Sequence, residues 1–186
     1  MNTISTLQYM ALSSLAYSQL DNAEGLDIGD LIRDSDNGVR AIRGYRDANG
    51  NVTPSFSALA TLSTYTLISF QSNTASGFAA AAFQAPAGPN GEPGEIIFTF
   101  RGTEPTTLPD LAADVAIFMQ DAYNTLSSHL DDAKAFVSSI LSNPMYSEAS
   151  YGFTGHSLGG AVSVAHSKFA SAIANKTLKT KEILGR

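Results

Sequence analysis

One short stretch constrains this chain more than any other. Gly155-His156-Ser157-Leu158-Gly159-Gly160 has the pattern G-x-S-x-G. A short apolar run over residues 149–154 precedes it, and an apolar run with helical spacing follows it. The stretch is therefore expected to be a sharp turn between a strand and a helix. Such a turn holds the central serine clear of the backbone, and it leaves little room for side chains two residues before and two residues after.

This turn is the kind of place that a nucleophile occupies. A serine hydroxyl becomes reactive when it is exposed and a base can take its proton. The helix that follows directs free N–H groups and the positive end of its dipole towards the serine. We therefore predict Ser157 as the catalytic nucleophile, Leu158 N–H as an oxyanion donor, and Gly155 and Gly159 as supporting residues. The alternative interpretation of the same residues is a glycine-rich loop without a catalytic role.

Length and composition favour one globular domain over residues 1–186. A hydrophobic fraction of 44% with only 15% charged residues excludes a disordered chain. The net charge of −6 and the absence of a basic cluster argue against nucleic acid as a partner. The chain has no cysteine, which excludes disulfides, thiolate catalysis and cysteine-ligated zinc. We expect no metal and no organic cofactor.

The N-terminal segment does not have the pattern of a signal peptide. Residues 1–18 lack a basic region and a long apolar core. No stretch reaches the ~18 apolar residues of a membrane span. Secretion would therefore require a route other than an N-terminal signal peptide, and the cytoplasm is the other location; the sequence does not choose between them.

The first half of the chain predicts one helix and three strands. Apolar residues recur at three- and four-residue spacing from Ile4 to Ala16, which predicts an amphipathic helix. A helical turn is expected over 27–32, and turns with the Asn-Gly signal over 34–38 and 47–51. These acidic turns lack the spacing of an EF-hand calcium loop. Strands are expected over 63–71, 78–84 and 95–100, as an antiparallel meander whose last strand is central and buried.

The second half predicts alternating helices and strands. A helix capped by Asp110 is expected to run through residue 119, and a separate long helix is expected over 122–141, ended by Asn143-Pro144. The strand before Ser157 and a last helix from Ala161 follow. This order is typical of a parallel sheet with crossover helices.

Two motifs together carry a resemblance. Phe100-Arg101-Gly102-Thr103, followed about fifty residues later by Gly152 to Gly160, resembles the fungal-type (class 3) lipase family, which includes bacterial phospholipases A1. The resemblance covers nearly the whole chain. It implies an α/β-hydrolase fold, with a mixed sheet, antiparallel N-terminal strands and a nucleophile turn on the parallel strands. It also implies a lid over residues 104–113.

The resemblance assigns roles to individual residues. Ser157 matches the nucleophile, and Leu158 matches one oxyanion donor. Thr103 matches the other donor, through its backbone N–H and its hydroxyl. Asp114 matches an acidic residue that orients this hydroxyl, although a carboxylate on a helix surface is the simpler alternative. Two donors suit a tetrahedral intermediate, because the loss of one typically costs ~3 kcal/mol. Arg101 is expected to be structural, paired with a carboxylate.

The sequence departs from this family in its triad. On this fold the acid and the histidine follow the nucleophile, but only Glu182 and His166 do so here. His156 is expected to point away from Ser157, and His166 lies about 13 Å along the next helix. His129 is expected on the solvated side of the long helix. The chain therefore resembles the N-terminal half to two thirds of a hydrolase, and we expect the triad acid and histidine beyond Arg186 or on a partner chain.

The leading hypothesis is a serine carboxylic-ester hydrolase acting on lipids, either a phospholipase A1 or a triacylglycerol lipase. It would form an acyl-enzyme on Ser157 at a membrane or lipid interface. One alternative is a catalytically incomplete fragment that binds a partner through an apolar face. Another is an esterase for small soluble esters.

Overall fold

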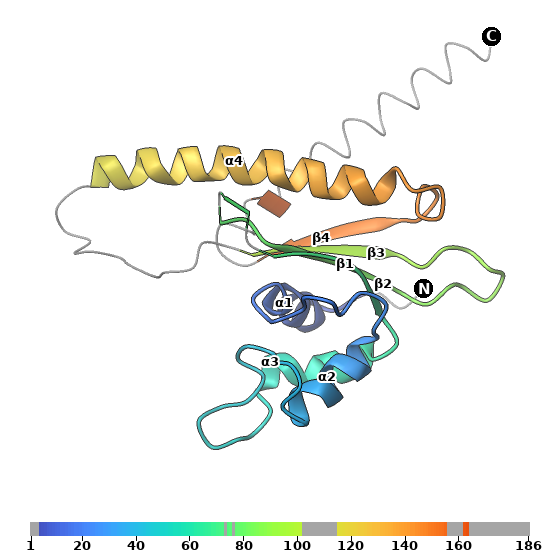
Figure 1. Cartoon of the computed structure of the whole chain (residues 1–186). Coiled ribbons are helices and arrows are strands. Elements are labelled where there is room, and N and C mark those ends of the chain that lie inside the picture. The colour runs from blue at the N-terminus through green and yellow to red at the C-terminus, as the bar shows by residue number, and fades with distance from the viewer. Residues whose placement is uncertain (1–3, 73, 76, 102–114, 156–161, 164–186) are drawn as a thin grey trace, which may run out of the picture.

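The fold is a mixed α/β domain in three layers. The computed structural model describes residues 4–72, 74–75, 77–101, 115–155 and 162–163, and the side chains of all of these except 54–55 and 115–127. Helix α4 lies on one face of a sheet, and α1, α2 and α3 lie on the other (Figure 1). The elements are α1 (Thr6–Leu15), α2 (Ile28–Asp36), α3 (Pro54–Ser57), the 3-10 helix η1 (Ala58–Leu62), β1 (Thr66–Gln71), β2 (Ala80–Gln84), β3 (Ile96–Phe100), α4 (Val115–Leu141) and β4 (Tyr151–Gly155).

The sheet has the strand order β1-β2-β3-β4 within the described residues. Strands β1, β2 and β3 form an antiparallel meander, and β4 adds to β3 in parallel. The three predicted N-terminal strands are confirmed, each slightly shorter than expected. All five residues of β3 are buried, which confirms that it is a central strand. Helix α4 makes the crossover that a parallel pair requires.

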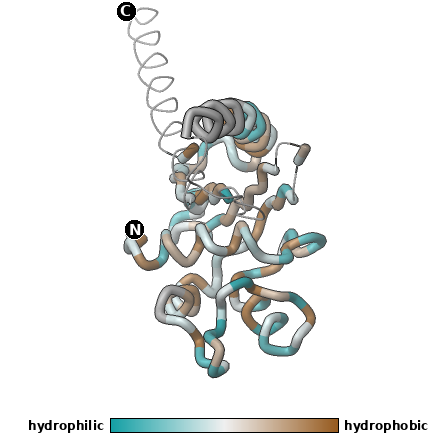
Figure 2. The backbone as a smooth tube through the Cα atoms, turned by 90° about the vertical axis from the view of Figure 1, so that its left-hand side faces the viewer, coloured by the Kyte–Doolittle hydropathy of each residue, from teal (hydrophilic) through white to brown (hydrophobic). Residues whose placement is uncertain are grey.

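Alternate residues of the strands point to opposite faces of the sheet and pack into two separate hydrophobic cores. On β3, Ile96, Phe98 and Phe100 belong to the core beneath α4, whereas Ile97 belongs to the core shared with α1. The alanine run of β2 is fully buried and divides between the same two cores. Figure 2 views α4 nearly along its axis, above the sheet. The sheet is therefore covered on both faces, as its apolar central strand predicts.

Helix α1 confirms the first predicted helix but not its whole apolar face. It begins with a capping box, in which Ser5 and Gln8 satisfy each other's backbone N–H groups. Leu12 and Leu15 are fully buried, whereas Leu7 is 56% and Met10 51% exposed. Residues three apart share one side of a helix, so Leu7 and Met10 form a second apolar side that faces away from the core.

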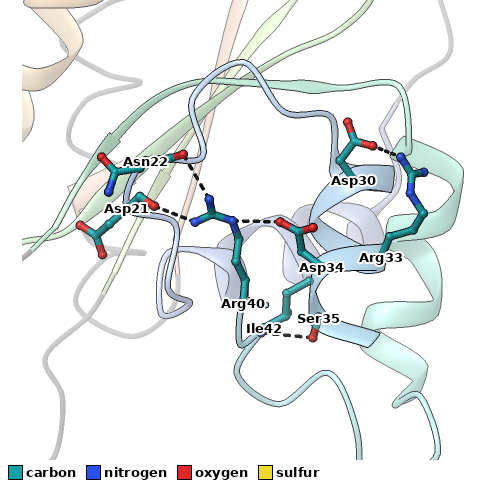
Figure 3. Close-up of polar contacts among 8 residues, drawn as sticks. All are labelled: Asp21, Asn22, Asp30, Arg33, Asp34, Ser35, Arg40 and Ile42. Atoms are coloured by element: carbon teal, nitrogen blue, oxygen red, sulfur yellow. Dashed lines mark hydrogen bonds and ion pairs between the residues drawn. The ribbon is translucent and has the colours of Figure 1, made fainter. Parts of the chain in front are cut away.

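Helix α2 is longer than the single turn expected. The segment 34–36, which was expected as part of a turn, is its last turn, and the helix ends where Gly38 adopts a φ of +73°. Arg40, which follows this helix in sequence, then links α2 to the segment that precedes it (Figure 3). Its guanidinium donates to the Asp34 carboxylate at 3.1 Å and to the carbonyl oxygens of Asp21 and Asn22 at 2.6 and 3.1 Å. The turn over 47–51 is confirmed, closed by Asp47 N–H on the Asn51 carbonyl.

Helix α4 corrects the prediction of two helices around residue 120. It is continuous for 27 residues, from Val115 to Leu141. The segment contains no proline or glycine, so nothing in it interrupts helical hydrogen bonding. Its second half packs Ala133, Phe136, Val137 and Ile140 against the sheet, with the Phe136 and Phe98 rings edge to face at 6.3 Å. It ends just before Asn143-Pro144, as predicted.

Candidate active site

The two predicted motifs leave the sheet side by side. Strand β4 runs parallel to β3 in a register that pairs Phe98 with Phe153 and Phe100 with Gly155. The carboxyl ends of both strands therefore lie at the same edge of the sheet. The Arg101-Gly102-Thr103 segment follows one strand and the His156-Ser157 segment follows the other. In sheets of this kind, ligand sites form at the carboxyl edge of the parallel strands.

Of the predicted site residues, the structure describes Gly155 alone. It is the last residue of β4, in the position expected for the first glycine of the turn. The others lie outside the described residues, so their arrangement stays a prediction: Thr103, Asp114, Ser157, Leu158 and Gly159.

Two described residues beyond the G-x-S-x-G stretch have helical backbone. Val162 and Ser163 are also buried, at 0% and 7% exposure. Val162 packs in the same core as Phe98, on the α4 side of the sheet. The described residues beside the stretch are therefore the end of a strand before it and two helical residues after it, which agrees with the context expected of a nucleophile turn.

Aromatic rings support the carboxyl edge of β3 and β4. The rings of Phe98 and Phe153 stack at 5.5 Å, and those of Phe100 and Phe153 stack at 6.1 Å. Phe78 lies 6.0 Å from Phe100 and extends this cluster towards the β1–β2 turn. The rings exclude water from the base of this edge and fix the strand ends by packing.

His129 corrects a sequence expectation. It was expected to be solvated, but it is only 1% exposed and meets the Phe78 ring edge to face at 5.8 Å. The sequence does hold the signal for this position. His129 precedes Ala133, Phe136 and Ile140 at steps of four, three and four residues, which places it on the buried side of α4.

Arg101 was expected to pair with a carboxylate, and its described contacts are instead with a backbone carbonyl and an aromatic ring. It is 9% exposed, and its Nη2 donates to the Gly77 carbonyl at 2.8 Å. Its guanidinium carbon lies 6.0 Å from the centre of the Tyr17 ring, and that of Arg43 lies 5.9 Å from the same centre. These contacts hold the chain where it leaves β3, immediately before Gly102-Thr103.

A partly open cavity lies at the opposite edge of the sheet. It has a volume of about 590 Å³, and its walls include Glu95 and Ser150, which precede β3 and β4. Because these two strands are parallel, this edge is opposite to the one at which Phe100 and Gly155 end them. The cavity is therefore separate from the candidate active site.

Glu95 influences two tyrosines beside this cavity. Burial raises the pKa of the Tyr9 phenol above its usual value of 10.0, and the Glu95 carboxylate raises it further. Burial and then Glu95 and Tyr9 raise the pKa of Tyr65 in the same direction. Both phenols therefore stay protonated at neutral pH. Sequence reasoning missed this group, because its members come from three distant segments.

Comparisons with protein-family models, with curated proteins and with solved structures found no match to this chain. What the described residues define is a mixed α/β domain with a four-stranded mixed sheet. In that same part of the chain, no helix is long and apolar enough to cross a bilayer. Nor do the described histidines and carboxylates gather into a group able to hold a metal ion.

Proposed function

We propose that this protein is a serine carboxylic-ester hydrolase of the α/β-hydrolase fold, with Ser157 as its nucleophile. The pairing of Phe100 with Gly155 carries the proposal, because it makes the Arg-Gly-Thr and Gly-His-Ser-Leu-Gly segments leave adjacent parallel strands at one edge. The buried helical residue Val162 supports it from the other side of the turn. The resemblance to class 3 lipases is part of the same proposal.

The chemistry is acyl transfer in two steps. The Ser157 oxygen attacks the acyl carbon, its proton passes to a base, and the ester oxygen leaves with a proton as an alcohol. Water then attacks the acyl-enzyme, which releases the carboxylic acid and restores the hydroxyl. Thr103 and Leu158 would donate hydrogen bonds to the negative oxygen that forms in each step, and Asp114 would orient the Thr103 hydroxyl.

The base is assigned outside the described part of the chain. His129 is directed into the core beneath α4, where it contacts Phe78, and we assign it to packing rather than to proton transfer. A base must come within hydrogen-bond reach of the serine oxygen, directly or through one water. A histidine held by a carboxylate is the arrangement that this reaction generally uses.

Lipid esters are the proposed substrates, either phospholipids or triacylglycerols, at a membrane or lipid surface. This part of the proposal rests on the resemblance alone. A lipid hydrolase is distinguished from an esterase for small esters by how its rate depends on the acyl length of the substrate and on whether the substrate is aggregated. A lipase or phospholipase is expected to turn over long-chain vesicles or emulsions faster than 4-nitrophenyl butyrate in solution.

A fluorophosphonate probe tests the nucleophile directly. The probe should label the wild-type protein when its triad base is present, and Ser157→Ala should abolish labelling. Ser150→Ala is the matched control, because Ser150 is an exposed serine at the other end of the same strand. Persistent labelling of Ser157→Ala, or its retention of ester hydrolysis, would refute the assignment.

A further inference from the structure

The cavity at the amino edge of β3 and β4 has the size and walls of a small-molecule site. Its volume of about 590 Å³ lies within the usual range for ligand pockets. It lies on the α1 side of the sheet, between η1, the start of β1 and the proline-rich β2–β3 loop. Its apolar walls are formed by Ile4, Leu62, Pro86, Pro89 and Pro93.

One carboxylate, that of Glu95, lies in the wall of the cavity together with Tyr65. Tyr9 stands beside Glu95, because a Cβ placed on Gly152 would lie 3.4 Å from Tyr9 Oη and 3.6 Å from Glu95 Oε1. Tyr9 belongs to α1, and Tyr65 and Glu95 directly precede β1 and β3. Burial first and the Glu95 carboxylate second raise the pKa of both phenols, which agrees with this proximity.

Among the described residues, no basic side chain pairs with this carboxylate. The described residues that line the cavity include neither lysine nor arginine. In the same part of the chain, the ion pairs involve other carboxylates, and Glu95 is in none of them. Glu95 is only partly exposed. A negative charge in a partly enclosed cavity, without a counterion among these residues, attracts a cation.

Glu92, the other acidic residue that lines the cavity, already accepts hydrogen bonds from within its own loop. Its carboxylate accepts hydrogen bonds from the backbone N–H of Asn90 at 3.2 Å and from Asn90 Nδ2 at 2.9 Å. These contacts fold the tip of the β2–β3 loop and hold the pKa of Glu92 below its usual value. The charge available to a ligand is therefore that of Glu95.

We propose that this cavity binds a small primary amine, with its ammonium group on the Glu95 carboxylate and its apolar body against the proline and leucine walls. A primary ammonium carries three N–H donors. The Glu95 carboxylate supplies acceptors and the Tyr9 oxygen lies near it, which suits this group better than a quaternary ammonium. The Tyr65 ring adds an aromatic surface at the same end. The site does not depend on the Ser157 chemistry.

Isothermal titration calorimetry with two matched small-molecule probes tests the proposal. Phenethylammonium is the ligand, and 2-phenylethanol is its neutral counterpart of nearly the same shape. We expect phenethylammonium to bind with a dissociation constant of about 1 mM or tighter, and 2-phenylethanol at least tenfold more weakly. Glu95→Gln should weaken phenethylammonium binding by tenfold or more. Glu148→Gln, at an exposed carboxylate that does not line the cavity, is the matched control and should leave it unchanged within twofold.

Three outcomes would overturn the proposal. They are no binding of phenethylammonium at 10 mM, equal binding of the alcohol, or an undiminished affinity in Glu95→Gln. A second probe, Nα-acetyl-lysine methylamide, carries the same ammonium on a peptide-like body. Tighter binding of this probe would assign the site to a protein lysine instead of a small amine. Ser157→Ala should bind phenethylammonium as the wild type does, so the two proposals fail separately.

Discussion

Phe100 and Gly155 are paired in parallel register at the ends of β3 and β4. Phe100 closes the strand that leads to Thr103, and Gly155 closes the strand that leads to Ser157. The Phe100 ring also stacks on Phe153, two residues before Gly155. The same packing therefore fixes both strand ends, and the proposed oxyanion segment and nucleophile segment start from one rigid edge. Sites built on rigid elements hold their geometry best.

The stability of that edge should depend on Phe98. Its ring is fully buried and meets Phe136 at 6.3 Å and Phe153 at 5.5 Å. Phe98→Ala should lower the free energy of unfolding by about 3–5 kcal/mol, because it removes these contacts and leaves a cavity. Urea denaturation followed by circular dichroism measures this. Phe70→Ala, on the partly exposed strand β1, is the control and should cost less than half as much.

The strands were predictable from sequence because their signals are local. Ile96–Phe100 is apolar at every position except Thr99 and lies between a proline-glycine segment and Arg101, and it became a fully buried strand. The Asn-Gly turn over 47–51 was predictable for the same reason, since Gly50 supplies the positive φ that the turn requires.

Long-range features were predicted less well. The apolar spacing of Leu7 and Met10 predicts burial, but whether a helix side is covered depends on elements distant in sequence. The polarity of His129 favours an exposed position, whereas its spacing to Ala133 and Phe136 places it on the buried side of α4, and the spacing prevails. Glu95, Tyr9 and Tyr65 could not be grouped, because 86 residues separate Tyr9 from Glu95 and only the parallel addition of β4 brings Gly152 beside both.

Thr103 should contribute to the transition state rather than to substrate binding. Under the proposed function, Thr103→Ala should lower kcat by about 10²-fold or more and leave KM nearly unchanged. Thr64→Ala, at an exposed threonine at the opposite edge of the sheet, is the matched control and should keep wild-type kcat. Initial rates across a range of ester concentrations separate the two constants. A rise in KM with unchanged kcat would place Thr103 in ground-state binding.

His129 should contribute to packing and not to catalysis. His129→Leu keeps most of the side-chain volume at a site with 1% exposure, so the protein should still fold. We expect the rate at which a fluorophosphonate labels Ser157, and its pH profile, to match the wild type. If labelling is lost while the unfolding midpoint is preserved, His129 takes part in proton transfer and its assignment to packing is wrong.

The two phenols beside Glu95 should make stability fall in alkaline solution. The pKa of Tyr9 and of Tyr65 is raised in the folded protein, by burial first and by Glu95 second, whereas in the unfolded chain it stays near 10. Below pH 10 both states hold these protons, and the contribution is fully present. Above pH 10 the unfolded chain releases protons that the folded protein retains, so the free energy of unfolding decreases as pH rises through the folded pKa.

Tyr9→Phe and Tyr65→Phe should each make that decrease shallower, and Tyr146→Phe, on the α4 side of the sheet, is the control. Urea midpoints measured from pH 8 to 11 test this, and slopes identical to the wild type in both variants would show that these phenols do not titrate differently in the two states.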